Sequence, residues 1–305
     1  MVFGHFCRNL RVNESVVDAR APVNVNRGFC YAPNEDMDTT HLPESYPRRR
    51  RGITLLPFSL ALFIFLWYLI VWIGDLRAFI LPTPDLVWER FLRTLEEGNL
   101  QRHFLITLGE VLGGLVLGGV LATVLGYLLA KSRPLERFLS HYIVASQSVP
   151  IVAIAPLLVI WFGPGITYKV LICALIVFFP ILINTIVGVR AVPDDLHDLM
   201  RSLQATRWQT FVLLEMPAAL PVLFGGLRIG ATLSVIGAVV GEFVGSDRGL
   251  GFLINMGRGL YDTPLVFVAV FSLVAMALFL YGLVVFVEQK LLSWQIRPEQ
   301  VISKR

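Results

Sequence analysis

Between Arg190 and Pro221 the chain reads RAVPDDLHDLMRSLQATRWQTFVLLEMPAALP, a polar stretch set between two long apolar segments. Aspartates crowd its beginning, where the exposed N–H groups and the dipole of a starting helix favour negative charge. Thr206, followed three places later by Gln209, predicts a capping box that opens a second helix. We therefore expect a helix-turn-helix finger in residues 190–217. Its first helix carries one apolar stripe made of Leu196, Leu199, Met200 and Leu203.

The composition places the chain among integral membrane proteins. Of its 305 residues 55% are hydrophobic and only 16% are charged, well below the roughly 25% charged residues of soluble domains. Cys7, Cys30 and Cys173 are too widely separated for a disulfide framework or a metal cluster, and we expect neither a metal nor a cofactor. The net charge of +4 does not indicate a nucleic-acid partner, because the basic residues lie beside apolar segments, where they set topology.

Six apolar segments are close to the roughly 20 residues that a helix needs to cross a bilayer. The third contains Pro150 and Pro156 and ends at Phe162, and we expect it to be broken or kinked near Pro150. The predicted fold class is all-α, a polytopic membrane bundle of six transmembrane helices in residues 53–288 that includes the finger at 190–217. The other five segments are expected at about 53–73, 104–130, 170–189, 218–240 and 265–287.

The second segment repeats glycines at a spacing of four residues. Gly109 pairs with Gly113, and Gly114 with Gly118. Such spacing permits close approach of a neighbouring helix. Glycines are also generally more frequent in membrane helices, so both interpretations stay open.

The flanking residues predict the orientation. Residues 1–52 are expected to be a disordered cytoplasmic extension, because their mixed polar composition cannot bury enough apolar surface. Met37 opens a stretch typical of a short leader before a membrane span, which favours residues 1–36 as an over-long start. Lys and Arg gather on the side of both termini and the finger, so these parts, including the tail 289–305, are predicted to be cytoplasmic. The expected location is the cell membrane.

A cytoplasmic amphipathic helix can lie on lipid, pack back on its own bundle or dock into another protein. Helices on a lipid surface carry Lys and Arg on their polar face. The first helix of the finger instead sets three aspartates against the single Arg201. A leucine stripe with an acidic face favours insertion into a groove of a soluble partner.

From about Leu81 to its C-terminus the chain resembles the permease subunits of binding-protein-dependent ABC importers, in the branch for nitrate, sulfonates, taurine and related solutes. The resemblance covers about three-quarters of the chain. It implies a six-span permease that forms a homodimer in the membrane lipid and works with two cytoplasmic ATP-binding subunits and an extracytoplasmic solute-binding protein. The matching stretches are LPTPDLVWERF (81–91), SVPIVAIAPLLVIWFGPG (148–165), FFPILINTIVGVRAV (178–192) and SLQATRWQTFVLLEMPAALPVLFGGLRIG (202–230).

In that family the finger is a coupling motif, Glu-Ala-Ala, three residues and Gly, which seats in a groove of the ATPase. Asp198 stands at the Glu position, the bulkier Leu199 and Met200 at the alanines, and Gln204 at the glycine. Since glycine tolerates a positive φ more easily than glutamine, we expect the turn to be built differently here. The groove should be shaped for the larger side chains. The expected ATPase-coupling residues are Asp198, Leu199, Met200, Arg201, Leu203 and Gln204.

The predicted function is therefore the permease subunit of an ATP-driven importer and not an enzyme. The nearest phosphate-loop-like string, which ends at Lys131 and Ser132, lacks the second glycine. The alternative is an ion-gradient-driven secondary transporter or channel, which usually shows inverted repeats and intramembrane carboxylates. We find no convincing repeat, and we expect Glu110 and Glu242 near the outer ends of their spans, where snorkelling to water is easy.

Polar residues inside the spans are candidates for the translocation pathway, although each could instead make a structural hydrogen bond. For Arg228 the structural interpretation is favoured. Inside the spans, Arg228 is outnumbered by Glu110 and Glu242, so the spans carry no excess of positive charge. This count favours a neutral or aromatic solute, such as a thiamine-precursor pyrimidine or riboflavin, over a nitrate-, sulfonate- or taurine-type anion. The candidate pathway residues are Gln147, Ser148, Asn184 and Arg228.

Overall fold

The computed structural model describes residues 52–75 and 77–293, and every regular element within these ranges is a helix. The expectations for the N-terminal extension, the start at Met37 and most of the basic tail lie outside the described residues. The elements are α1 (Gly52–Gly74), α2 (Pro84–Glu96), α3 (Asn99–Lys131), α4 (Arg133–Gln147), α5 (Ile151–Phe162), α6 (Thr167–Arg190), α7 (Asp194–Ser202), α8 (Arg207–Thr210), the π-helix η2 (Phe211–Glu215), α9 (Met216–Gly245), α10 (Leu250–Gly259) and α11 (Thr263–Leu291).

Four of the described helical segments are long and apolar enough to cross a membrane, namely α3, α6, the run from Arg207 to Gly245, and α11. Helices α4 and α5 meet the same criterion together and enclose a 92° bend, which lies at Pro150 as the sequence predicts. Helix α1 is a further apolar helix of 23 residues. The all-α membrane bundle is confirmed, whereas the count of six spans stays a prediction.

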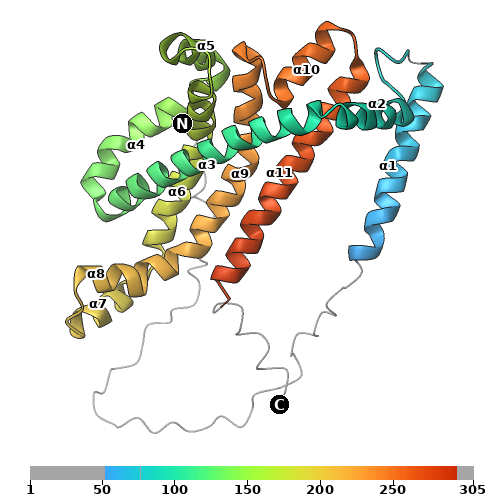
Figure 1. Ribbon diagram of the computed structural model, residues 1–305. Coiled ribbons are helices and arrows are strands. Elements are labelled where there is room, and N and C mark those ends of the chain that lie inside the picture. The colour runs from blue at the N-terminus through green and yellow to red at the C-terminus, as the bar shows by residue number, and fades with distance from the viewer. Residues whose placement is uncertain (1–51, 76, 294–305) are drawn as a thin grey trace, which may run out of the picture. The chain divides into compact units, whose positions relative to one another are not determined.

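Helix α6 lies at the centre of the packing, against α3 on one side and α9 on another, while α11 packs on α9 and α10 (Figure 1). The seam between α3 and α6 depends on glycine. A Cβ on Gly114 would overlap the Cys173 side chain, and one on Gly118 would lie 2.9 Å from Cα of Ala174. By contrast, a Cβ on Gly109 would meet nothing within 4 Å. Close helix approach therefore explains the pair Gly114 and Gly118 but not Gly109.

The second helix of the finger is not a separate element. α8, η2 and α9 form one continuous helical run from Arg207 to Gly245, although the sequence places the fifth span only at 218–240. Within η2 the N–H of Met216 donates to the carbonyl of Phe211, the i to i−5 pattern of a π-turn. Pro217, which has no N–H to donate, follows directly. The finger thus passes into the membrane helix through a π-turn rather than through a loop.

Helix α2 contacts the end of α1. Trp67 Nε1 donates to the carbonyl of Pro82 at 3.1 Å, and the Tyr68 hydroxyl donates to Asp85 at 3.1 Å. A hydrogen bond from the Thr83 side chain lowers the pKa of Asp85. These contacts fix α2 across the end of α1.

Candidate functional site

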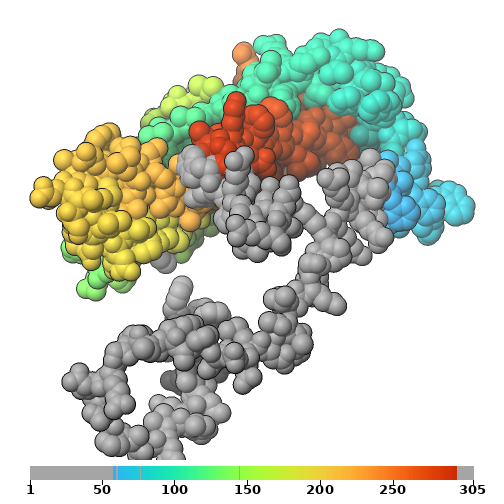
Figure 2. Space-filling model, turned by 90° about the horizontal axis from the view of Figure 1, so that it is seen from below, coloured from blue at the N-terminus to red at the C-terminus, as the bar shows by residue number. Residues whose placement is uncertain are grey.

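The apolar stripe of α7 faces outward. No residue of α7 is buried, and Leu199 and Leu203 are 54% and 69% exposed. In Figure 2 the surface of α7 and α8, in yellow, forms one end of the face shown, with no other described helix covering it. The stripe is therefore not packed back on its own bundle. Of the expected coupling residues, Met200 is partly exposed and the others are exposed: Asp198, Leu199, Arg201, Leu203 and Gln204.

The turn after α7 corrects one expectation. Gln204 itself adopts the left-handed conformation, with φ 55°. Its N–H donates to the carbonyl of Arg201 at 2.9 Å, and the N–H of Ala205 donates to that of Met200 at 3.0 Å. This pair of bonds is the Schellman arrangement, which ordinarily places glycine at the left-handed position. The turn is thus of the kind that glycine favours, and the expectation that glutamine requires a different turn is wrong.

Side-chain hydrogen bonds hold the rest of the finger in shape. The predicted capping box is present, since the N–H of Gln209 donates to Thr206 Oγ1 at 3.3 Å and the N–H of Thr206 donates to Gln209 Oε1 at 2.8 Å. Arg201 pairs with Asp198 at 2.9 Å, but both side chains are largely exposed, and such pairs contribute little stability. These two charges thus remain accessible to a partner.

The predicted pathway residues occupy different settings. Asn184 Nδ2 donates to the carbonyl of Pro180 at 2.8 Å in its own helix, and a Cβ on Gly226 of α9 would lie 2.7 Å from the Asn184 Cβ. Arg228 Nε donates to Glu288 of α11 at 2.7 Å, in agreement with its structural interpretation. Gln147 and Ser148 lie exposed at the bend between α4 and α5. Their place on a solute path stays a prediction.

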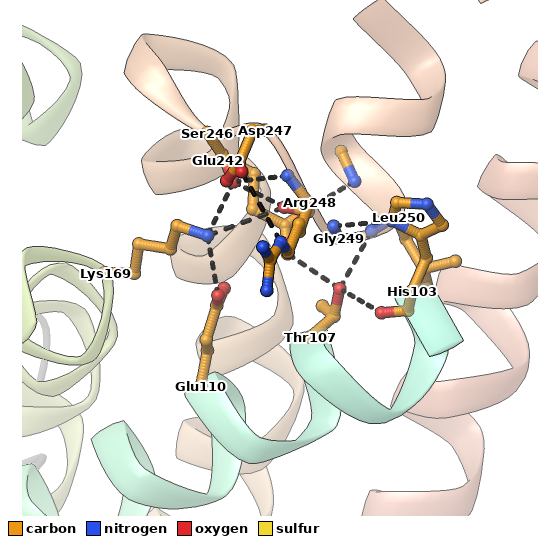
Figure 3. Close-up of polar contacts among 11 residues, drawn as sticks. His103, Thr107, Glu110, Lys169, Glu242, Ser246, Asp247, Arg248, Gly249 and Leu250 are labelled. Carbon is orange, nitrogen blue, oxygen red and sulfur yellow. Dashed lines mark hydrogen bonds and ion pairs between the residues drawn. The ribbon is translucent and has the colours of Figure 1, made fainter. Parts of the chain in front are cut away.

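A cluster of buried charges lies at the far end of α9 from the finger. Figure 3 shows Glu110 of α3 and Lys169 of α6 pointing toward each other, with Glu242 of α9 beside them. Lys169 Nζ donates to Glu110 Oε1 at 2.7 Å and to Ser246 Oγ at 2.6 Å. Both carboxylates are 1% exposed. The expectation that Glu110 and Glu242 snorkel to water is therefore wrong.

The same cluster anchors the connection between α9 and α10. Thr107 of α3 donates to Glu242 Oε1 at 2.7 Å and accepts the N–H of Leu250 at 2.9 Å. His103 Nδ1 accepts the N–H of Gly249 at 2.8 Å. Gly249 has φ 112°, and a Cβ there would overlap the Glu242 carboxylate, so only glycine fits. Helices α3, α6 and α9 are thus joined at this end by polar contacts. We call this set the outer cluster, because the sequence predicts that the end of the bundle away from the finger lies outside the cytoplasm. It comprises Thr107, Glu110, Lys169, Glu242 and the residues 246–251.

The outer cluster was missed by reasoning on the sequence, which assigned Lys169 to a loop. In this cluster Lys169 pairs with Glu110, Arg248 pairs with Asp247, and Glu242 accepts hydrogen bonds from Thr107 and the N–H of Gly251, so no cation is left over for an anion. A cavity of about 580 Å³ opens beside it, lined in part by Glu110, Tyr168, Lys169 and Arg248. The run GSDRGLG at 245–251 was the available signal, because clustered glycines mark close approach of backbone to other groups.

Comparison with known proteins matches residues 118–293 to the family described as binding-protein-dependent transport system inner membrane component. The chain is 49% identical to the riboflavin transport system permease protein RibX of Chloroflexus aurantiacus, over 79% of this chain and 90% of that protein. It is 34% identical to the formylaminopyrimidine transport permease protein ThiX of Halalkalibacterium halodurans, over 76% and 94%. It is 28% identical to the taurine transport system permease protein TauC of Escherichia coli, over 80% and 91%.

Among solved structures, a chain of the MetNI methionine ABC transporter in an inward-facing conformation has a fold similar to that of this chain. The TM-score is 0.56 at 20% sequence identity, and the match covers 66% of this chain and 98% of the solved chain. At this identity the likeness concerns the fold alone.

Proposed function

Because the chain belongs to the family of binding-protein-dependent transport system inner membrane components and is the permease subunit of an ABC importer, we propose that its solute is a neutral heteroaromatic compound of the riboflavin type. The observation that carries this proposal is the 49% identity to a riboflavin permease over 90% of that protein. The identities to the formylaminopyrimidine and taurine permeases are 34% and 28%.

The charges of the described spans support a neutral solute over an anion. Lys169 is held by Glu110, and Arg228 is held by Glu288. Glu242 adds a further carboxylate without a cation of its own. A path for sulfonate or nitrate would gain from unpaired positive charge along its wall, because a buried anion needs a compensating partner. The flavin ring system is uncharged near neutral pH and needs no such partner.

The finger supplies the coupling to ATP. Its exposed leucine stripe, accompanied by acidic side chains, suits a groove on a cytoplasmic ATP-binding subunit. Closure of two such subunits would move the fingers of a permease homodimer and shift the spans between inward-open and outward-open states. In this arrangement both termini and the finger are cytoplasmic. The outer cluster faces the extracytoplasmic binding protein, and the chain itself performs no catalysis.

Uptake into vesicles tests the proposal. The protein is reconstituted with its own ATP-binding subunit and solute-binding protein, and riboflavin fluorescence inside the vesicles is followed with ATP or a non-hydrolysable analogue. We expect ATP-dependent riboflavin accumulation that excess taurine does not reduce. Accumulation of taurine without riboflavin would refute the solute assignment. Riboflavin uptake that survives ATP depletion but collapses with an uncoupler would instead indicate ion-gradient-driven transport.

A further inference from the structure

A buried carboxylate lies where the finger joins the membrane helix. Glu215 ends η2, and its side chain is only 3% exposed. Glu215 Oε2 accepts the hydroxyl of Tyr127 at 3.0 Å, and Oε1 accepts Nζ of Lys131. Tyr127 and Lys131 both belong to the last two turns of α3. His197 of α7 lies 3.9 Å from the same Oε1, so this one carboxylate joins the finger to α3.

Aromatic contacts strengthen the same junction. The ring of Phe211, at the start of η2, meets the ring of Tyr127 edge-on with centroids 5.0 Å apart. Trp208 lies behind it, with its ring centroid 5.6 Å from that of Phe211. The π-turn thus begins and ends with a side chain that contacts Tyr127. Aromatic pairs in this geometry attract each other beyond the effect of the area they bury.

The other end of the finger is attached to the same part of α3. Arg190, the last residue of α6, donates to both carboxylate oxygens of Glu136 at 2.7 and 2.6 Å, and Glu136 lies in the first turn of α4, which follows α3 directly in the chain. It also donates to the carbonyls of Leu129 and Ala130 at 3.3 and 3.5 Å. The last carbonyls of a helix lack partners within the helix and favour a cation. Arg190 therefore caps α3 while it begins the finger.

We propose that Arg190 and Glu215 are positioning residues that clamp both ends of the finger onto the C-terminal turns of α3, so that a displacement of the finger carries α3 with it. The covalent chain already connects the finger to α6 and α9, and the clamp adds the third helix of the central packing. This inference rests on the coupling role proposed above. Between Lys131 and Thr107 of the outer cluster, α3 spans 24 residues, roughly 36 Å at 1.5 Å per residue.

A distance within one chain tests whether the finger and α3 move together. Spin labels are placed at Ser202 of α7 and at Leu121 of α3, both exposed, after Cys7 and Cys30 are replaced by serine. Labelled chains are diluted with unlabelled ones, so that only distances within a chain are measured. The complex with its ATP-binding subunits is compared without nucleotide and with ATP under conditions that block hydrolysis. We expect the same narrow distance distribution in both states.

The variant that breaks the clamp combines Arg190→Gln with Glu215→Gln. We expect its distance distribution to broaden and to shift with nucleotide. Lys131→Met serves as a second variant that should fold, because its side chain is 45% exposed, and we expect the same change to a smaller extent. The matched control is Glu288→Gln, which removes an ion pair between α9 and α11 and should leave the distribution as in the wild type.

Either of two results would overturn the clamp. One is a wild-type distance between finger and α3 that changes with nucleotide. The other is a narrow, unchanged distance in both the double variant and Lys131→Met. Failure of the ATP-binding subunits to co-purify with the wild-type protein would instead refute the coupling role itself. In that case the nucleotide-free comparison of wild type and variants still tests whether Arg190 and Glu215 hold the finger on α3.

Discussion

Replacing Lys169 by methionine should destabilise the protein strongly, because it removes the ammonium from a cluster that retains two buried carboxylates. The Lys169 and Glu110 side chains are 7% and 1% exposed and lie 2.7 Å apart. Breaking a buried ion pair by removing one partner costs about 3–5 kcal/mol. We expect a loss of this size in the free energy of unfolding, measured by denaturant titration of the detergent-solubilised protein.

A second change distinguishes lost charge from lost packing. Adding Glu110→Gln to Lys169→Met removes the carboxylate that Lys169 contacts and leaves Glu242, which keeps its hydrogen bonds to Thr107 and Gly251. Part of the stability should therefore return, because neutral replacement of both partners of a buried pair is often tolerated. Lys290→Met, at an exposed position of α11, is the control and should change stability by less than about 0.5 kcal/mol. A Lys169→Met protein as stable as the wild type, or a double variant less stable than the single, would refute this account.

Five further substitutions test the finger and the glycine seam. Asp198→Lys or Leu203→Asp should leave the permease inserted but abolish transport, because either places a mismatched charge in the docking groove; normal co-purification of the ATPase and normal transport would contradict docking. Gln204→Gly should raise the free energy of unfolding slightly, because it removes the left-handed strain of glutamine, about 1–2 kcal/mol, while the greater freedom of glycine in the unfolded chain takes back about 0.5–1 kcal/mol. A lower free energy of unfolding in the same denaturant titration would contradict the turn described. Gly118→Leu should prevent α3 from packing on α6 and lower the melting temperature, whereas Gly109→Ala should leave it nearly unchanged; equal effects of these two would contradict the seam.

Much of the fold follows from local pattern. Runs of apolar residues predicted the membrane helices, and Pro150 predicted the break between α4 and α5. Thr206 and Gln209 predicted a capping box that is present. These features depend on residues within a few positions of one another, whose preferences are not overridden by distant contacts. The exposure of α7 followed from the same kind of reasoning, because an acidic face beside a leucine stripe favours docking into another protein.

The features that sequence reasoning missed depend on contacts between distant residues. Lys169 stands at the edge of an apolar segment, and only the fold places it against a carboxylate 59 residues earlier. Glu215 likewise contacts residues distant in sequence, because its partners precede it by 84 and 88 residues. Glutamine disfavours a positive φ, but at Gln204 the two backbone hydrogen bonds of the turn outweigh this preference. Pairing across helices leaves no periodic signal in the sequence.

The outer cluster also bears on how the protein is made. Glu110 enters the membrane with α3, 59 residues before Lys169 is synthesised, and Glu242 follows later still. A lone carboxylate on a membrane helix is costly until it meets a partner. A nascent chain halted before α6 therefore keeps an unneutralised charge in α3, and docking of α6 onto α3 supplies its counter-ion. The packing of α6 on α3 therefore also removes a cost that α3 bears alone until α6 is in place.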